Sequence, residues 1–263
     1  MERKNKFCKI PEEIITKAIE LYKSGVSITK ISKELHLDRG NLSIRLKENG
    51  CEIKQHCNKK KVNEEFFDVL NQDSSYWLGF IFADGYLSDS NGLEISSKDK
   101  EHIEKFKECI GSTHKIGVKV INGCEYYRIN ITNKKIAASL RKYGIHNKKS
   151  YGWKIPEMSK EMHCHFIRGL IDGDGTISDN RIGRTLDIRI CSYSKEVLIN
   201  VLDLIQNSVD LKNNWSIYSS EKRIPYLRIN NYGTQREFLK WLYNDATIYL
   251  NRKHEKALCI LPS

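Results

Sequence analysis

Apolar residues dominate two ten-residue stretches of the chain that resemble one another. The first is Tyr76–Gly85, with the sequence YWLGFIFADG, and the second is Phe166–Gly175, with the sequence FIRGLIDGDG. Read as helices, both are apolar nearly all round, which is typical of buried helices rather than surface ones. We therefore predict two buried helices as the centre of the fold.

Small residues recur at a spacing of four in both stretches, as Gly79 and Ala83 in the first and Gly169 and Gly173 in the second. Small residues at this spacing form a flat stripe along which two helix backbones can approach closely. We expect the two helices to pack against each other along these stripes. Each stretch ends in Asp-Gly, and we expect the glycine to cap its helix in a left-handed conformation.

Alternating apolar and polar positions after each buried stretch predict β-strands. In each half, one alternating run leads into an amphipathic helix and a second run follows that helix. The runs are Leu93–Ser96 and Tyr126–Asn130 in the first half, and Leu186–Ile190 and Pro225–Asn230 in the second. Each half is therefore predicted as helix, two strands, helix, two strands, helix.

The separation between matching positions of the two halves grows gradually along the chain. It is 90, 95 and 100 residues for the pairs Asp84–Asp174, Ile95–Ile190 and Arg128–Arg228. Such drift is typical of a duplicated unit that has gained small loop insertions, and we place one insertion around residues 179–184. The chain therefore contains an internal repeat.

A separate pattern of short helices precedes the repeat, over residues 11–50. Pro11 opens the first helix, and Ser27 and Asp38 are predicted to cap the second and third, with stops at Gly25 and Gly50. Three short helices of this kind resemble a helix-turn-helix, whose final helix enters the DNA major groove. The predicted base-reading residues are Arg39, Asn41, Ser43 and Arg45. A small helical bundle used for protein contact is the alternative.

These patterns divide the chain into four segments. Residues 1–50 are the predicted helix-turn-helix domain, 51–63 a lysine-containing linker, 64–155 the first repeat and 156–263 the second. The linker has little apolar pattern, so it either follows phosphates or serves as a solvated tether.

Composition favours a polyanionic partner. The 263 residues include 44 Lys and Arg against 33 Asp and Glu, a formal net charge of +11. A basic surface would also fit a membrane-surface or ribosomal protein. No signal peptide or apolar run of 18 residues occurs, so we expect a soluble, intracellular protein of the cytoplasm or nucleoid.

Eight cysteines without a Cys-x-x-Cys pair indicate a reduced chain with neither a disulfide framework nor a zinc site. The cluster His163-Cys164-His165 contains ligand residue types, but adjacent residues converge poorly on one metal.

The two acids at the helix ends are the main candidates for chemistry. A carboxylate at a helix C-terminus faces the negative end of the helix dipole, and Asp84 and Asp174 would also repel each other in a parallel pair. A divalent cation would offset both effects, because carboxylate and carbonyl oxygens are its preferred ligands. Two buried helices that merely end in Asp-Gly, a common turn pair, are the alternative.

The paired stretches resemble the two motifs of single-chain LAGLIDADG homing endonucleases. The second is close to the consensus, whereas Phe82 in the first replaces the acidic residue expected two positions before Asp84. The resemblance covers roughly residues 65–258. It implies an α+β fold of two pseudosymmetric αββαββα repeats, whose sheets form a saddle over double-stranded DNA with a long target site.

The resemblance also implies metal-dependent phosphodiester hydrolysis with Mg²⁺ or Mn²⁺, for which two metal ions are the usual arrangement. Asp84 and Asp174 would be the metal ligands, with the backbone carbonyls of Ala83 and Gly173. In the family a basic residue lies near each scissile phosphate, and Lys149 and Lys253 are the candidates here, with Lys148 and Arg252 as close competitors. Asp99 and Ser194 occupy the place of a water-orienting residue.

One face of each predicted sheet is polar and is the candidate DNA surface. Its residues are Tyr126, Arg128 and Asn130 in the first repeat, and Arg189, Tyr226, Arg228 and Asn230 in the second. An ordinary solvated sheet face is the alternative.

We expect a monomeric, site-specific double-strand DNA endonuclease. A catalytically silent DNA-binding regulator and an intron RNA maturase on the same fold are the alternatives.

Overall fold

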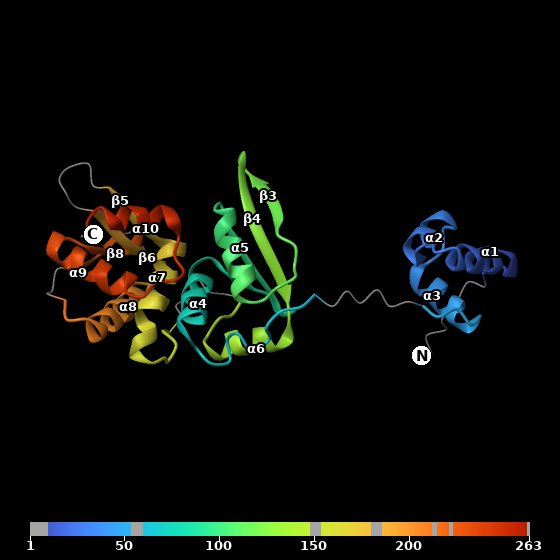
Figure 1. The fold of residues 1–263 in the computed structure, drawn as a ribbon, viewed down its shortest axis with the longest axis horizontal. Coiled ribbons are helices and arrows are strands. Elements are labelled where there is room, and N and C mark those ends of the chain that lie inside the picture. The colour runs from blue at the N-terminus through green and yellow to red at the C-terminus, as the bar shows by residue number, and fades with distance from the viewer. Residues whose placement is uncertain are drawn as a thin grey trace. The chain divides into compact units, whose positions relative to one another are not determined.

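The computed structural model describes residues 10–53, 60–147, 154–179, 186–211, 215–220 and 223–261. The chain separates into two compact units, Met1–Lys59 and Lys60–Ser263 (Figure 1). Each unit is described by itself below. None of the helices in the described ranges is both long and apolar enough to cross a membrane.

The first unit contains the three predicted helices, α1 (Glu12–Lys23), α2 (Ile28–Glu34) and α3 (Arg39–Glu48). The Ser27 and Asp38 side chains accept hydrogen bonds from the first turns of α2 and α3, as expected of N-caps. Gly25 and Gly50 have φ angles of +92° and +74°, which lie in the left-handed region that favours glycine. The core of this unit is built from Ala18, Ile31, Leu42, Leu46 and Cys51.

The second unit contains the duplicated αββαββα pattern, so the predicted fold class is confirmed. The first repeat consists of α4 (Gln72–Asp84), β1 (Tyr86–Leu87), β2 (Gly92–Ser97), α5 (Lys100–Cys109), β3 (Gly117–Ile121), β4 (Cys124–Thr132) and α6 (Lys134–Lys142). The second consists of α7 (His163–Asp174), β5 (Gly175–Asp179), β6 (Leu186–Cys191), α8 (Lys195–Ser208), β7 (Trp215–Ser220), β8 (Arg223–Ile229) and α9 (Tyr232–Tyr243). A short 3₁₀ turn (Lys160–Met162) precedes α7, and a further helix, α10 (Asn251–Leu258), follows α9.

Each repeat forms a four-stranded antiparallel sheet, in the orders β1-β2-β4-β3 and β5-β6-β8-β7. Alternate side chains such as Ile129 and Ile131 are buried in the shared core, while Arg128 and Asn130 between and beside them are exposed. The predicted division into an apolar face and a polar face is therefore present.

Strand register corrects one part of the predicted repeat alignment. Leu87 pairs with Leu93 and Leu93 with Ile131, whereas Ile177 pairs with Ile188 and Ile188 with Ile229. Matching residues of the two sheets are thus 90, 95 and 98 positions apart in sequence, and not 90, 95 and 100.

The helix caps that follow these strands support the corrected alignment. Asn133 caps α6 and Asn231 caps α9 in the same way, and these two residues are also 98 apart. Arg228 therefore corresponds to Asn130 rather than to Arg128.

Helices α4 and α7 pack side by side and parallel between the two sheets (Figure 1). A methyl group added to Gly79 would overlap the carbonyl oxygen of Phe166, and one added to Gly169 would overlap that of Tyr76. One turn further on, a methyl group on Gly173 would overlap the Ala83 side chain. The predicted contact along the two small-residue stripes is confirmed.

The predicted left-handed cap at each helix end is wrong. Gly85 has φ −77° and Gly175 has φ −92°, so both are extended. A Cβ on Gly85 would lie 2.8 Å from the Ile81 Cα, and one on Gly175 would lie 2.7 Å from the Ile171 Cα. Glycine is required here by close backbone approach, not by its backbone angles.

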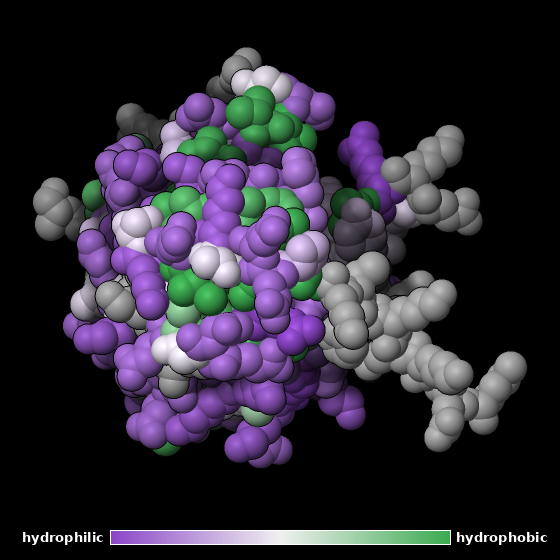
Figure 2. Space-filling model, turned by 90° about the vertical axis from the view of Figure 1, so that its right-hand side faces the viewer, coloured by the Kyte–Doolittle hydropathy of each residue, from purple (hydrophilic) through white to green (hydrophobic). Residues whose placement is uncertain are grey.

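The large apolar side chains gather in two clusters, one in each compact unit. On the face drawn in Figure 2, hydrophilic residues surround smaller hydrophobic patches. This surface agrees with the charged composition of the chain and leaves the helix pair as the centre of the larger core.

Candidate functional site

Asp84 and Asp174 lie at the same end of the helix pair. Each is the last residue of its helix and is exposed to solvent. Their helices touch immediately before them, at Ala83 and Gly173, and a Cβ on Gly173 would lie 3.5 Å from the Asp84 amide nitrogen. The structure therefore brings the two predicted acids to one exposed edge of the helix pair.

Lys253 lies beside these acids, on α10, with only 3% of its surface exposed. Its Nζ donates to the carbonyl oxygens of Ile171 at 2.5 Å, Asp172 at 2.9 Å and Gly175 at 2.8 Å. These bonds use all three hydrogens of the ammonium group, so it caps the C-terminal carbonyls of α7. In this arrangement the ammonium group has no hydrogen left for a further hydrogen bond.

Burial lowers the pKa of the Lys253 ammonium to about 8, while the negative charges of Asp172, Asp84 and Asp174 act in the opposite direction. Both predicted metal ligands are therefore close enough to Lys253 for their charges to influence it. The three side chains form one electrostatic group at the end of the helix pair.

Asp172 is a buried acid that sequence reasoning did not single out. Its Oδ2 accepts hydrogen bonds from the Tyr76 hydroxyl and from the Leu250 amide, both at 2.8 Å. The Tyr76 oxygen also lies 3.1 Å from Nε2 of His102. Burial raises the pKa of Asp172 to about 6, with Lys253 opposing the shift. An acid inside a buried helix was the signal in the sequence.

Arg168 is a second buried charge that was missed. Its guanidinium donates to the carbonyls of Leu242 at 2.7 Å and Ile248 at 2.8 Å, and it lies 2.8 Å from Nδ1 of His165. It therefore ties α7 to the last turn of α9 and to the segment between α9 and α10. A charged residue in the middle of an otherwise apolar helix was the available signal.

Comparison with known proteins bears on these repeats. Residues 161–242 match the family model described as LAGLIDADG-like domain. This match covers most of the second repeat. No curated protein matches the sequence.

Three solved structures are similar to this chain. The homing endonuclease I-WcaI bound to its DNA recognition sequence has a TM-score of 0.53 and 14% identity, covering 82% of this chain and 98% of that one. Mesophilic variants of the homing endonuclease I-DmoI reach a TM-score of 0.47 at 15% identity, covering 73% and 97%. Full-length DUF199/WhiA from Thermatoga maritima reaches 0.48 at 16%, covering 75% and 64%. At 14% identity, the similarity to I-WcaI shows a shared fold and nothing about activity.

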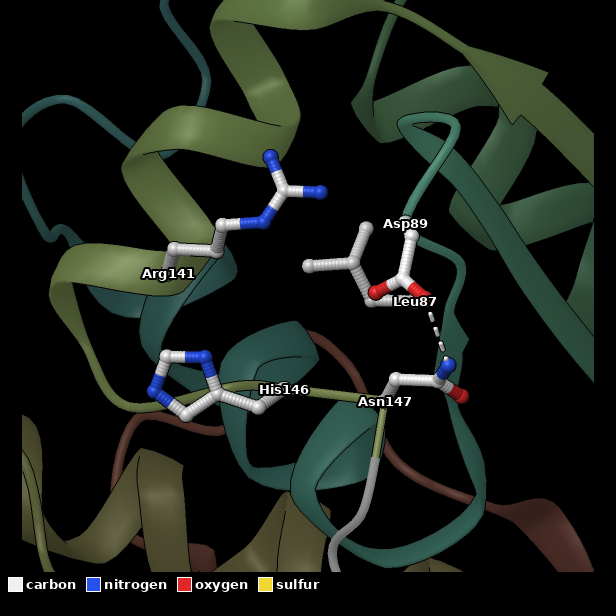
Figure 3. A pocket seen from close by; sticks show the side chains of 5 residues that line it. All are labelled: Leu87, Asp89, Arg141, His146 and Asn147. Carbon is white, nitrogen blue, oxygen red and sulfur yellow. Dashed lines mark hydrogen bonds between the residues drawn. The ribbon is translucent and has the colours of Figure 1, made fainter.

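The other predicted basic residue, Lys149, lies outside the described residues, as does Lys148. The chain just before it passes a pocket of about 290 Å³ between the β1–β2 turn and α6 (Figure 3). There Asn147 donates to Asp89 at 3.1 Å, and Arg141 donates to Asn91 at 2.7 Å. The Asn147 bond tethers the segment after α6 to the β1–β2 turn, and the Arg141 bond ties α6 itself to the same turn.

The two predicted water-orienting residues are the N-cap residues of matching helices. Asp99 precedes α5, and its Oδ2 lies 3.2 Å from the Arg252 guanidinium of the second repeat. Ser194 precedes α8, and its hydroxyl oxygen accepts from the Val197 amide at 3.5 Å. Both side chains thus have protein partners here, and a water-orienting role stays a prediction.

The polar face of the first sheet carries its predicted residues beside an acid. Arg128 and Asn130 both approach Glu94, at 3.7 and 3.5 Å. The Lys98 ammonium lies 5.3 Å from the centre of the Tyr126 ring.

The matching face of the second repeat is a tighter cluster. Asp187 contacts Arg189 at 2.8 Å and Arg228 at 3.1 Å, and the Arg189 guanidinium lies 5.0 Å from the Tyr226 ring. Asn230 donates to the Ser216 hydroxyl at 2.8 Å. The sequence prediction for the two sheet faces named cations, amides and aromatic rings, and it missed the acids Glu94 and Asp187.

The cluster His163-Cys164-His165, which contains metal-binding residue types, lies at the start of α7. His163 contacts the Ser208 hydroxyl at 2.6 Å, and Cys164 and His165 are buried. Within the described ranges, no group of three or more His, Cys, Asp or Glu side chains gathers as a metal site.

The four predicted base-reading residues of α3 lie on two flanks of that helix. Arg39 and Ser43 line a groove together with Lys47, which was not predicted, whereas Asn41 and Arg45 are not among its lining residues. Arg45 instead contacts Glu48 at 3.0 Å on the same helix. The groove continues along the α1–α2 corner and the segment after α3, through Tyr22, Lys23, Gly25–Thr29 and Gly50–Ile53.

Proposed function

We propose that the protein is a site-specific double-strand DNA endonuclease that requires a divalent metal ion. The observation that carries this proposal is the pair of exposed carboxylates, Asp84 and Asp174, at the touching ends of two parallel helices. Each acid comes from one pseudosymmetric half, which fits a duplex whose two strands are also related by a pseudo-twofold axis.

The donor set at the helix ends fits magnesium or manganese. The protein would hold the ion through the carboxylates of Asp84 and Asp174 and the carbonyl oxygens of Ala83 and Gly173. Mg²⁺ commonly uses one or two carboxylates and retains several waters, and substrate phosphate oxygens complete its coordination. When bound, it polarises the phosphate, activates water and stabilises the leaving oxygen. Structures of I-DmoI have been solved in complex with DNA and Mn or Ca.

The chain's own residues would orient the duplex and balance charge. The two carboxylates lie at the negative ends of their helix dipoles, and the Lys253 ammonium offsets part of that negative charge where a phosphate would approach. Arg128, Arg189 and Arg228 on the polar sheet faces supply cations for phosphates and guanidinium groups for guanine.

Two other functions fit the same fold. One is a DNA-binding regulator that does not cut, and the other is an RNA maturase that binds an intron. The exposed acid pair favours the nuclease, because a protein that only binds nucleic acid gains nothing from two carboxylates facing a polyanion.

A cleavage assay distinguishes these functions. The substrate is a plasmid that carries the joined DNA flanks of the gene, because such an enzyme is expected to cut the uninterrupted form of its own locus. With Mg²⁺, the full chain should convert the plasmid to one linear product, and a chelator should prevent this. Binding without cutting would support the regulator, and selective binding of intron RNA would support the maturase.

We further propose that the first unit binds DNA through the flank of α3 that carries Arg39, Ser43 and Lys47. The groove beside this flank is lined by the cations Lys23, Arg39 and Lys47 and the hydroxyls of Ser27, Thr29 and Ser43. Cations and hydroxyls are the groups that contact DNA phosphates and base edges. Arg45, on the other flank, is already paired with Glu48.

The two flanks of α3 provide a matched test in the full chain, without a cleaving metal. Arg39→Ala should weaken binding to the long target by about 1–3 kcal/mol if its guanidinium contacts a base. Lys47→Ala should reduce the dependence of binding on salt by about one phosphate contact. Arg45→Ala should leave affinity within roughly twofold, as surface ion pairs contribute little. Equal effects of Arg39→Ala and Arg45→Ala on affinity would contradict the proposal.

A further inference from the structure

The contact between α4 and α7 is symmetric in its backbone but not in its side chains. Tyr76 of α4 donates to Asp172 of α7, whereas at the matching pair Phe166 of α7 packs edge-on against Phe82 of α4, with ring centroids 5.6 Å apart. The difference extends to α5 and α8, where His102 corresponds to Val197. One side of the helix pair is therefore a buried polar network, and the other is apolar.

This network reaches the start of the helix that carries Lys253. Asp172 accepts from the Leu250 amide, and Leu250 is the N-cap residue of α10. The Leu250 carbonyl in turn accepts from the Lys253 amide at 2.9 Å. Asp172 therefore fixes the first turn of α10 against α7.

The Lys253 side chain makes a second contact between α10 and α7, with the backbone of α7. Its ammonium donates to the carbonyls of Ile171 and Asp172, next to the carboxylate that holds Leu250. The side chain of Asp172 thus positions α10, and the side chain of Lys253 from α10 caps the helix that contains Asp172. The two contacts therefore join α7 and α10 in both directions.

Tyr76 is the contribution of the first repeat to this arrangement. Its ring is fully buried, and among the described residues its hydroxyl is one of two donors to Oδ2 of Asp172, whose Oδ1 is buried without a hydrogen-bond partner. A buried carboxylate needs such donors, because an unpaired buried charge is strongly unfavourable. Tyr76 of the first repeat therefore supports, across the helix interface, the residues that hold Lys253 of the second repeat.

We propose that Tyr76 and Asp172 are positioning residues that hold Lys253 at the α7 end, so that cleavage of the two DNA strands depends on different supporting residues. This inference rests on the proposed nuclease function for its consequence on cleavage. The positioning itself is a property of the metal-free protein.

The positioning is tested on the full chain without metal or DNA, by amine acylation followed by mass spectrometry. Lys253 should be protected in the parent protein because its ammonium group is buried. Tyr76→Phe, which removes one hydroxyl, should speed acylation of Lys253 by about two- to tenfold, the factor that corresponds to one hydrogen bond. Asp172→Asn should speed it at least as much.

Phe82→Leu, at the position that matches Asp172, is the control, and it should leave acylation of Lys253 unchanged. Folded Tyr76→Phe and Asp172→Asn variants with a fully protected Lys253 would overturn the positioning role. Equal acceleration in Phe82→Leu would also overturn it, because the effect would then follow from general loosening of the helix interface.

The consequence for cleavage is tested with a duplex target labelled separately on each strand. Lys253→Met should identify the strand that depends on Lys253 by slowing its cleavage more than that of the other strand. Tyr76→Phe should slow the same strand by about two- to tenfold and the other strand by less than roughly twofold, so that nicked DNA accumulates.

Equal slowing of both strands by Tyr76→Phe would overturn the strand-specific role, since a purely structural defect affects both. If the parent protein cuts neither strand, the proposed function fails, whereas the acylation result still decides whether Tyr76 and Asp172 position Lys253.

Discussion

The two sides of the α4–α7 interface show what a duplicated fold keeps and what it changes. Both sides retain small residues where the backbones touch, because a methyl group at Gly79 or Gly169 would overlap a carbonyl oxygen of the other helix. Between those contacts, one side holds Tyr76 and Asp172 and the other holds Phe166 and Phe82. Close backbone approach requires small residues at these contacts, whereas the buried pairs between them are polar on one side and aromatic on the other.

The largest effect is expected where the two sides are alike. Overpacking a core typically costs about 1–3 kcal/mol. Gly79→Ala should destabilise the protein by more than this, because the new methyl group would overlap the Phe166 backbone. Gly233→Ala is the matched control, since Gly233 is an exposed helical glycine whose nearest neighbour is the Asn231 side chain. Urea unfolding measures both. Equal stability of the two variants would contradict the close contact.

A smaller effect is expected where the two sides differ. Phe82→Asp would place an acid at the position that matches Asp172, but Phe166 offers it no hydroxyl. We expect a loss of about 3 kcal/mol in unfolding free energy, as for a buried carboxylate without a partner. Adding Phe166→Tyr should recover part of this loss. No recovery in the double variant would show that a facing tyrosine is not what makes Asp172 tolerable.

At neutral pH the smallest effect is expected at His102, which has Val197 at its matching position. Burial, followed by the charge of Lys105, lowers the pKa of His102 to about 3 from an ordinary value of 6.5. The unfolded chain therefore takes up a proton below pH 6.5 that the folded protein does not, so stability falls as pH falls from 6.5 toward 3. His102→Gln should make unfolding free energy less dependent on pH in this range, by about 1.4 kcal/mol per pH unit. Parallel stability curves for the two proteins would contradict this.

Much of the fold could be predicted from the sequence because its constraints are local or periodic. The Gly79–Ala83 and Gly169–Gly173 stripes predicted the helix pair, and alternation predicted the strands. The predicted left-handed cap at Gly85 was wrong because a glycine after a helix can be required either by a positive φ angle or by close backbone approach. Only the structure shows the Ile81 backbone against that glycine.

The site was less predictable because its buried contacts join residues far apart in sequence. Asp172 bonds to Leu250, 78 positions away, and Lys253 reaches the carbonyl of Ile171, 82 positions away. Periodicity within one segment does not report such contacts. The repeat offset of 100 also failed, because Arg128 and Arg228 share a residue type but not a register position.

The central claim is that Asp84 and Asp174 act together at the end of the helix pair. It is tested most directly by Mg²⁺-dependent cleavage of the joined-flank plasmid by Asp84→Asn and Asp174→Asn, with binding measured in parallel. Each variant should lose about 100-fold or more in cleavage rate, as when a major electrostatic element of an active site is removed, and should still bind DNA. Unchanged cleavage in either variant would contradict the claim.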